Sequence, residues 1–295
     1  MTGAGVAGPG VTAASLDAPW SPSERELERR RVRRRDRLRK RLLALAVTVG
    51  VFLVLGYVIT GSAGWPVVRE AFFSGYHARK ALPAIAKGFL TNIAMFLVAE
   101  PFILLIGIAV AVTRQTVTPW LTPLRFLAVA YTDLLRGVPT LLVVLLMALG
   151  IPALQLTGIT SSLFWLTTTA LVLCYGAYVA EVVRAGIESI HPSQVASAQA
   201  MALSRAQTMR HVVLPQALRR VVPPLMNDFV SLQKDTALVS VVGVTEGLLA
   251  AQDYGNYHFN FTPLLVTGAF FVALTVPLAR FTDWLGRRAV RRERG

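Results

Sequence analysis

The chain has 295 residues, of which 54% are hydrophobic and only 16% are charged. Soluble proteins seldom contain apolar runs of about 20 residues, the length that a helix needs to cross roughly 30 Å of hydrocarbon. The net charge of +14 could suggest nucleic acid, but eleven of the 30 Lys and Arg lie between Arg25 and Arg41 and six between Arg280 and Arg294. Both clusters flank apolar segments, which is typical of cytoplasmic anchors, so composition excludes a soluble nucleic-acid-binding protein and indicates a polytopic membrane protein.

The N-terminal part divides into a basic tail and an apolar helix. Residues 1–41 are predicted to be a disordered cytoplasmic tail, because Gly, Ala, Ser and Pro dominate its first 24 positions and arginines follow. The segment from Leu42 to Thr60 is long enough to span, so we interpret it as an uncleaved signal-anchor helix within a region of residues 42–87. The single cysteine, Cys174, excludes an intramolecular disulfide.

Apolar segments recur along the chain and predict an all-α membrane protein with about six transmembrane helices. They are residues 42–61, 89–113, 126–150, 162–181, 217–243 and 263–281. With the N-terminus inside, the cytoplasmic segments hold 24 Lys and Arg and the external loops hold four. This asymmetry predicts a multi-pass protein of the cytoplasmic membrane, with both termini and the loop 182–215 in the cytoplasm.

The loop 182–215 is polar and lies between two apolar segments. Pro192 suits the first turn of a short helix, and Ser204 with Gln207 forms a capping-box pattern that opens a second helix. We expect Leu214-Pro215 to interrupt that second helix. Small residues would let another protein approach closely: Ala196, Ser197, Ala198, Ala200 and Ala202. Spacing alone leaves open both a docking surface and an ordinary surface hairpin.

This loop resembles the EAA loop of permease subunits in binding-protein-dependent ABC importers. Members of that family typically show Glu-Ala-Ala, then a glycine and, further on, Leu-Pro. The matching positions here are Ala196-Ser197-Ala198, Ala202 and Leu214-Pro215, so the glutamate, the first alanine and the glycine are replaced. If the glycine position needs a left-handed backbone, Ala202 costs about 1 kcal/mol. The resemblance implies docking on an ATPase through Gln194, Ala196, Ser197, Ala198, Ala200, Ala202, Leu203, Ser204, Arg205, Leu214 and Pro215.

Three further blocks are similar to the polar amino acid branch of this family. They are Asp133–Pro139 (DLLRGVP), Gly176–Arg184 (GAYVAEVVR) and Asn227–Val244 (NDFVSLQKDTALVSVVGV). The resemblance covers residues 88–285 and implies a type I importer permease core of five helices plus one N-terminal helix, with residues 286–295 as a basic cytoplasmic tail. It also implies three partners: a cytoplasmic ABC ATPase dimer, a second permease subunit and an extracytoplasmic substrate-binding protein. ATP and Mg²⁺ are expected on the ATPase, and no cofactor on this chain.

Ionisable side chains within predicted spans cost several kcal/mol unless they are paired or face water, so each is a candidate for the translocation path or a gate. Asp133 and Arg136, three residues apart on one helical face, could pair and either brace a helix break or form a gate. Glu100 and Asp228 match no residue of the family pattern, and our hypothesis is that one of them recognises a cationic group. The candidates are Glu100, Asp133, Arg136, Asn227, Asp228, Lys234 and Asp235.

Motifs for enzymatic chemistry are absent from the sequence: it has no phosphate loop, zinc-protease motif or esterase nucleophile elbow. We therefore predict no catalytic or metal-binding residues, and a subunit of an ATP-driven importer of a polar amino acid, coupled through residues 192–214. Three alternatives stay open. They are an importer of another small polar solute (an opine or a compatible solute), a channel or scaffold without an ATPase, and an intramembrane enzyme using Glu100, Asp133 or Asp228.

Overall fold

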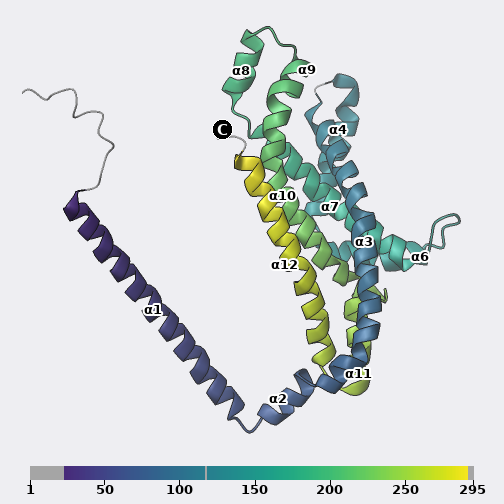
Figure 1. Ribbon diagram of the computed structural model, residues 1–295. Coiled ribbons are helices and arrows are strands. Elements are labelled where there is room, and N and C mark those ends of the chain that lie inside the picture. Colours follow the sequence, from purple (N-terminus) through teal and green to yellow (C-terminus); the bar gives the residue numbers. More distant parts are fainter. Residues whose placement is uncertain (1–22, 117, 292–295) are drawn as a thin grey trace, which may run out of the picture. The chain divides into compact units, whose positions relative to one another are not determined.

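The computed structural model describes residues 23–116 and 118–291, which form helices and no strands (Figure 1). The predicted all-α class is confirmed. The helices are α1 (Glu24–Thr60), α2 (Trp65–Phe72), α3 (Gly75–Gln115), α4 (Thr122–Gly137), α5 (Thr140–Leu145), α6 (Ile151–Ala153), α7 (Leu163–Glu188), α8 (Pro192–Ala200), α9 (Arg205–Thr208), α10 (Leu214–Asp235), α11 (Gly247–His258) and α12 (Thr262–Arg291). Between them lie the 3₁₀ turns η2 (Pro119–Leu121) and η5 (Thr236–Val242) and the π turns η3 (Leu146–Gly150) and η4 (Met209–Val213). The chain divides into two units, Met1–Pro66 and Val67–Gly295.

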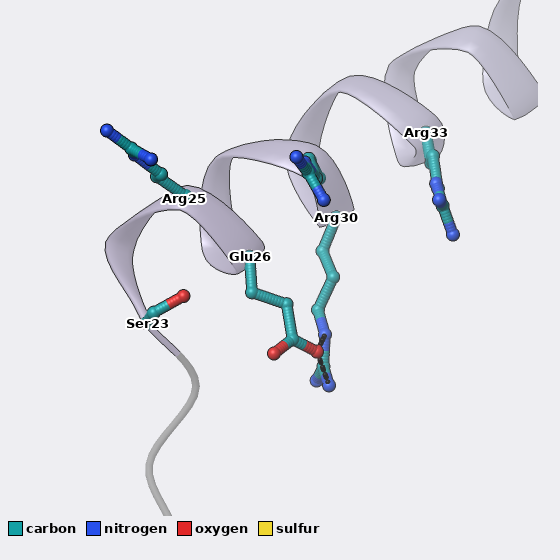
Figure 2. Close-up of a pocket in the computed structure, with 6 residues that line it drawn as sticks. Ser23, Arg25, Glu26, Arg30 and Arg33 are labelled. Carbon is teal, nitrogen blue, oxygen red and sulfur yellow. Dashed lines mark hydrogen bonds and ion pairs between the residues drawn. The ribbon is translucent and has the colours of Figure 1, made fainter.

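Helix α1 makes up most of the first unit and continues without a break for 37 residues. Its polar start consists mainly of Arg, Lys, Glu and Leu, which are strong helix formers, and Glu24 and Glu26 lie in the first turn, where the helix dipole favours negative charge. Figure 2 shows this start, where Arg30 donates to Glu26 at 2.7 Å. The structure differs here from the predicted disordered tail, because the helix formers of residues 24–41 extend the apolar helix that follows. Residues 1–22 lie outside the described ranges.

The apolar part of α1, residues 42–60, is exposed within its unit. Phe52 is 69% exposed and Tyr57 is 81% exposed. Leaving such side chains in water costs about 25 cal/mol for each Å² of apolar surface, whereas hydrocarbon solvates them. The exposure therefore fits a helix whose solvent is lipid.

Within the described residues, four helical stretches are long and apolar enough to cross a membrane. They are Glu24–Thr60, Trp65–Gln115, Leu163–Glu188 and Thr262–Trp284. A further candidate is bent: Pro119–Gly137 and Thr140–Ala153 meet at 105°. The prediction of one continuous span over 126–150 is therefore wrong. Val138 is extended, as a residue before proline tends to be, and Pro139 has no backbone N–H with which to continue the helix.

The fifth segment that we predicted as a span, residues 217–243, consists of most of α10 followed by η5. It does not pass the same test of length and apolarity. Charged residues occur at both of its ends and in its middle, namely Arg219, Arg220, Asp228, Lys234 and Asp235. A helix of this composition needs polar neighbours or water on one side to lie at membrane depth.

The expected helix end at Leu214-Pro215 is absent, and α9 continues through η4 into α10. The backbone N–H of Leu214 donates to the carbonyl of Met209, five residues earlier, which is the π pattern. Pro215 then occupies the first turn of α10. A missing backbone N–H costs little at this position, because the first N–H groups of an α-helix have no acceptor within the helix. The segments α9, η4 and α10 therefore form one continuous helical rod.

The core of the second unit lies between α3 and α7. These helices approach closely at Gly107, which has no side chain. A Cβ at this position would lie 2.4 Å from Cγ1 of Val179 and 3.2 Å from the carbonyl oxygen of Gly176. Around this contact lie the buried side chains Met95, Phe96, Ile103, Leu171, Cys174 and Leu232. Any side chain at position 107 would push the two helices apart and open this core.

Asn260 ties the link between α11 and α12 to the last turn of α2. Its Nδ2 donates to the carbonyl of Glu70 at 2.8 Å, and its Oδ1 accepts the N–H of Thr262 at 3.0 Å. The N–H of Phe261 donates to Ala71 at 2.7 Å. Because Asn260 is only 4% exposed, its Asn-Phe-Thr sequence serves packing in this fold.

Candidate functional site

The hairpin of α8 and α9 turns through a left-handed residue. Ala202 has a φ of 60°, its N–H donates to Gln199 at 2.9 Å, and the N–H of Leu203 donates to Ala198 at 3.2 Å. These two bonds form a Schellman motif, which normally places glycine at the left-handed position. The left-handed backbone considered from the sequence is therefore present, and alanine costs about 1 kcal/mol there.

The second arm of the hairpin begins with the predicted capping box, which is confirmed. The N–H of Gln207 donates to Oγ of Ser204 at 3.3 Å, and the N–H of Ser204 donates to Oε1 of Gln207 at 2.9 Å. Two otherwise unsatisfied backbone donors are thereby bonded, so the turn between α8 and α9 has a defined geometry.

Most of the predicted coupling residues lie on the surface of this hairpin. The exposed ones are Gln194, Ala196, Ser197, Ala200, Ala202, Ser204, Arg205, Leu214 and Pro215. Leu203 is half-buried, and Ala198 is only 3% exposed, on the side of α8 from which Val195 packs against Val213. Ala198 therefore supports the hairpin from within. Sequence reasoning missed Met201, which is 76% exposed between the two arms; an apolar side chain in a polar loop was the signal.

Glu181, near the cytoplasmic end predicted for α7, joins three helices. Its carboxylate lies 3.0 Å from Nη1 of Arg114 on α3, 3.6 Å from Nη1 of Arg136 on α4 and 2.5 Å from Nη2 of Arg184 on α7. Arg114 also donates to Thr132 at 2.8 Å, and Arg184 pairs with Glu188. Since Glu181 is 19% exposed and Arg114 is 13% exposed, water screens these pairs only partly.

The pairing of Asp133 with Arg136, which the sequence allowed, does not occur. Arg136 pairs with Glu181, while Asp133 is exposed and forms no ion pair with any residue that the structure describes. Helical spacing placed the two residues on neighbouring positions, but the packing of α4 against α7 brings a better-placed carboxylate to the arginine. Sequence reasoning missed this cluster of Glu181 with Arg114, Arg136 and Arg184, which we call the Glu181 node. Glu181 and Arg184 nevertheless belong to one of the blocks that resemble the family.

Two of the candidate carboxyl groups come together from different helices. Glu100 on α3 and Asp228 on α10 lie near each other, and Oδ2 of Asp228 is buried without a hydrogen-bond partner among the described residues. Nearby, the hydroxyl of Tyr175 on α7 donates to Asp235 at 2.7 Å. Asp228 and Asp235 thus both lie near Tyr175. The arrangement could accept a charged hydrogen-bond donor, because the buried Oδ2 of Asp228 has no partner among the described residues.

The other two candidates on α10 lie apart from this group. Lys234 is exposed, as is Asn227. Adjacent residues of a helix point in directions about 100° apart, so Lys234 cannot follow Asp235 toward Tyr175. Tertiary packing therefore brings together three of the predicted path residues, Glu100, Asp228 and Asp235.

A buried polar network joins α3 to the start of α11, and it was not predicted. Glu246, 0% exposed, accepts the N–H groups of Leu248 and Leu249 at 2.8 Å each and Nδ2 of Asn92 at 2.9 Å. Asn92 also donates to Thr236 at 3.1 Å and accepts the N–H of Gly247 at 3.0 Å. The carboxylate therefore caps α11 and fixes it on α3. The one signal of this network in the sequence is that Asn92 is a polar residue within an apolar segment.

A family profile matches residues 81–291 and carries the description "Binding-protein-dependent transport system inner membrane component". This chain belongs to that family. The matched residues contain both arms of the hairpin, the Glu181 node, the Glu100–Asp228 pair and the buried Glu246. The chain is thus a transport component and a multi-pass membrane protein, with the fold of the type I importer permeases.

Curated relatives of this permease come from bacterial amino acid transport systems. It is 32% identical to the probable glutamine ABC transporter permease protein GlnM of Bacillus subtilis over 68% of this chain and 91% of the relative. It is 29% identical to the arginine transport system permease protein ArtQ of Bacillus subtilis over 67% of this chain and 88% of the relative.

Solved structures of two transporters resemble this permease. A crystal structure of an amino acid ABC transporter with histidines matches with a TM-score of 0.65 and 27% identity, over 71% of this chain and 95% of that one. An inward-facing MetNI methionine ABC transporter matches with a TM-score of 0.58 and 21% identity, over 70% of this chain and 97% of that one. The second likeness establishes the fold alone. Helix α1 lies N-terminal to the residues of this permease that the family profile matches.

Proposed function

We propose that this permease is the membrane subunit of an ATP-driven importer that carries a polar amino acid across the cytoplasmic membrane. The observation that carries the proposal is the hairpin: small, exposed residues on α8 and α9 surround a turn whose backbone is fixed by a Schellman motif and a capping box. Such a rigid surface, with small side chains at several exposed positions, suits close contact with a cleft of another protein. The proposal of amino acids as the substrate class is based on the sequence similarity to the glutamine and arginine permeases.

The partners in this proposal are a cytoplasmic ABC ATPase dimer with ATP and Mg²⁺, a second permease subunit and an extracytoplasmic binding protein. Because α9, η4 and α10 form one rod, movement of the hairpin is transmitted directly to Asp228 and Asp235 in the proposed path. The Glu181 node links the adjoining end of α7 to α3 and α4, so these helices would tilt with it. Both termini and the hairpin face the cytoplasm in this arrangement, as the distribution of Lys and Arg favours.

The proposed path lies at the interface of two permease subunits and uses the candidates Glu100, Asp133, Arg136, Asn227, Asp228, Lys234 and Asp235. Within this set, Glu100 and Asp228 are proposed to recognise a cationic group. If they do, Glu100→Gln and Asp228→Asn will each lower uptake of a cationic amino acid more than that of glutamine. Unchanged preference in both variants would contradict this role.

Uptake of a labelled panel of amino acids, opines and compatible solutes tests the function as a whole. Cells with and without the gene are compared before and after ATP depletion. We expect loss of the gene to abolish ATP-dependent uptake of one polar amino acid. Gene-dependent uptake that persists without ATP would instead favour a channel, and activity of the purified chain on a substrate without ATP would favour an enzyme.

Coupling is tested separately on the hairpin surface. Ala196→Arg and Ala200→Arg add bulk to exposed positions of α8, so we expect at least about a tenfold loss of ATP-dependent uptake with normal membrane insertion, a loss typical of a disrupted interface contact. Ser161→Arg, exposed between α6 and α7, is the matched control. Ala198→Arg is unsuitable because Ala198 is buried. Full transport by both hairpin variants would contradict docking at this surface.

A further inference from the structure

The basic half of α1 has a charge distribution that transport of an amino acid does not explain. This part of the chain precedes the residues that the family profile matches. From Glu24 to Val32, four basic residues stand with three acidic ones. From Arg33 to Arg41, seven basic residues stand with a single acidic one, Asp36. The positive charge is therefore concentrated in the nine positions next to the apolar part of the helix.

The position of this segment along the helix determines what it can reach. A helix rises 1.5 Å per residue, so Arg33–Arg41 extends about 14 Å from the apolar boundary at Leu42. The polar layer of one leaflet is about 5–8 Å thick, and charges act over a further 8 Å or so at physiological salt. All seven basic residues are thus within range of lipid phosphates. The acid-containing turns from Glu24 to Val32 extend to about 27 Å and lie largely beyond that range.

The side chains of Arg33–Arg41 are available to a ligand. All nine are exposed. Lys40 lies 3.6 Å from Asp36, and Nε of Arg37 donates to the carbonyl of Arg33 at 3.2 Å. In residues 23–116 and 118–291, no other side chain of this segment has an ion pair. Such dense positive charge repels itself unless an anion lies close by.

We propose that Arg33–Arg41 is a binding site for the phosphate headgroups of anionic phospholipids in the bilayer that α1 crosses. Guanidinium groups bind phosphate oxygens through paired, charge-assisted hydrogen bonds, and several basic residues directly beside a transmembrane helix attract anionic lipids additively. The apolar part of α1 anchors the segment beside the headgroups. Binding of a lipid therefore requires no separate association of the segment with the membrane. Anionic lipid therefore gathers around the N-terminal helix of each subunit.

The test uses the full chain in neutral detergent, titrated with a phosphatidylglycerol and with the phosphatidylcholine of the same acyl chains. The variant R34Q/R35Q/R37Q removes three charges within the segment. The matched control R25Q/R29Q/R30Q removes three charges from the same helix beyond the reach of lipid. We expect the first variant to bind phosphatidylglycerol at least about tenfold more weakly, with less than about a threefold change in the control.

Salt dependence is a second measurement that needs no variant. Raising the salt from about 0.05 M to about 0.5 M shortens the Debye length severalfold, so it is expected to weaken phosphatidylglycerol binding by the wild-type chain and to leave phosphatidylcholine binding unchanged. Equal binding of the two lipids, equal losses in the two variants, or binding insensitive to salt would each overturn the proposal. Loss of a co-purifying acidic protein from R34Q/R35Q/R37Q with lipid binding intact would also overturn it, in favour of a protein partner.

Discussion

The hairpin of α8 and α9 and the Asn92–Glu246 network both satisfy polar groups, but by opposite means. In the hairpin the bonds join residues a few positions apart, such as Ser204 with Gln207, and the residues are exposed. In the network Asn92 bonds residues 144 and 154 positions away, and Glu246 is fully buried. The hairpin thus shapes an exposed surface, which we propose as the docking site, whereas the network holds helices together. Substitutions in the two regions should separate docking from global stability.

The largest effect is expected from Glu246→Ala, which removes a helix cap and leaves Asn92 and two backbone N–H groups without their acceptor. We expect the free energy of unfolding to fall by about 3 kcal/mol. The midpoint of thermal unfolding in detergent measures this. Asp253→Ala, at an exposed position of the same helix, is the control and should leave the midpoint nearly unchanged. Equal stability of the two variants would mean that the network is not what holds α11.

A somewhat smaller loss is expected from Gly107→Ala, because the new Cβ would lie 2.4 Å from Val179. Separating α3 from α7 should cost about 2 kcal/mol. Gly268→Ala provides the matched control, since a Cβ at Gly268 meets nothing within 4 Å. The same unfolding measurement applies, and a stable Gly107→Ala protein would show that the close helix contact is dispensable.

Ser204→Ala should act on the hairpin alone. Loss of the capping side chain costs about 1 kcal/mol of local stability, so faster amide hydrogen exchange is expected over α9, with little change in the global unfolding midpoint. Weaker ATPase binding with an intact fold would follow from the proposed docking. If the unfolding midpoint drops as far as in Glu246→Ala, the division between local and global regions fails.

The smallest expected effect has the opposite sign. Ala202→Gly relieves the left-handed backbone at the end of α8 and should stabilise the hairpin by about 1 kcal/mol or less. Slower hydrogen exchange of residues 198–204 is the measurement, and Leu203→Gly, which has no positive φ to relieve, is the control. Faster exchange in Ala202→Gly would mean that the alanine methyl group contributes packing that outweighs the strain.

Prediction from sequence succeeded where the responsible interactions are local. The capping box needs only Ser204 and Gln207, and the long apolar helices follow from runs of apolar residues. It failed where alternatives of similar local energy compete. The bend at Val138-Pro139 and the continuous helix through Pro215 both involve a proline, and the neighbouring turn geometry decides whether the helix stops or continues.

The sequence by itself determined the helical class, the membrane as solvent and the hairpin, because apolar length, charge asymmetry and capping patterns act over a few residues. Only the tertiary structure decided that Arg136 pairs with Glu181, that Glu100 lies near Asp228 and that Glu246 caps α11 against Asn92. These arrangements involve residues far apart in the chain. Their existence depends on how closely helices such as α3 and α7 pack, and the identity of the residues alone does not encode that distance.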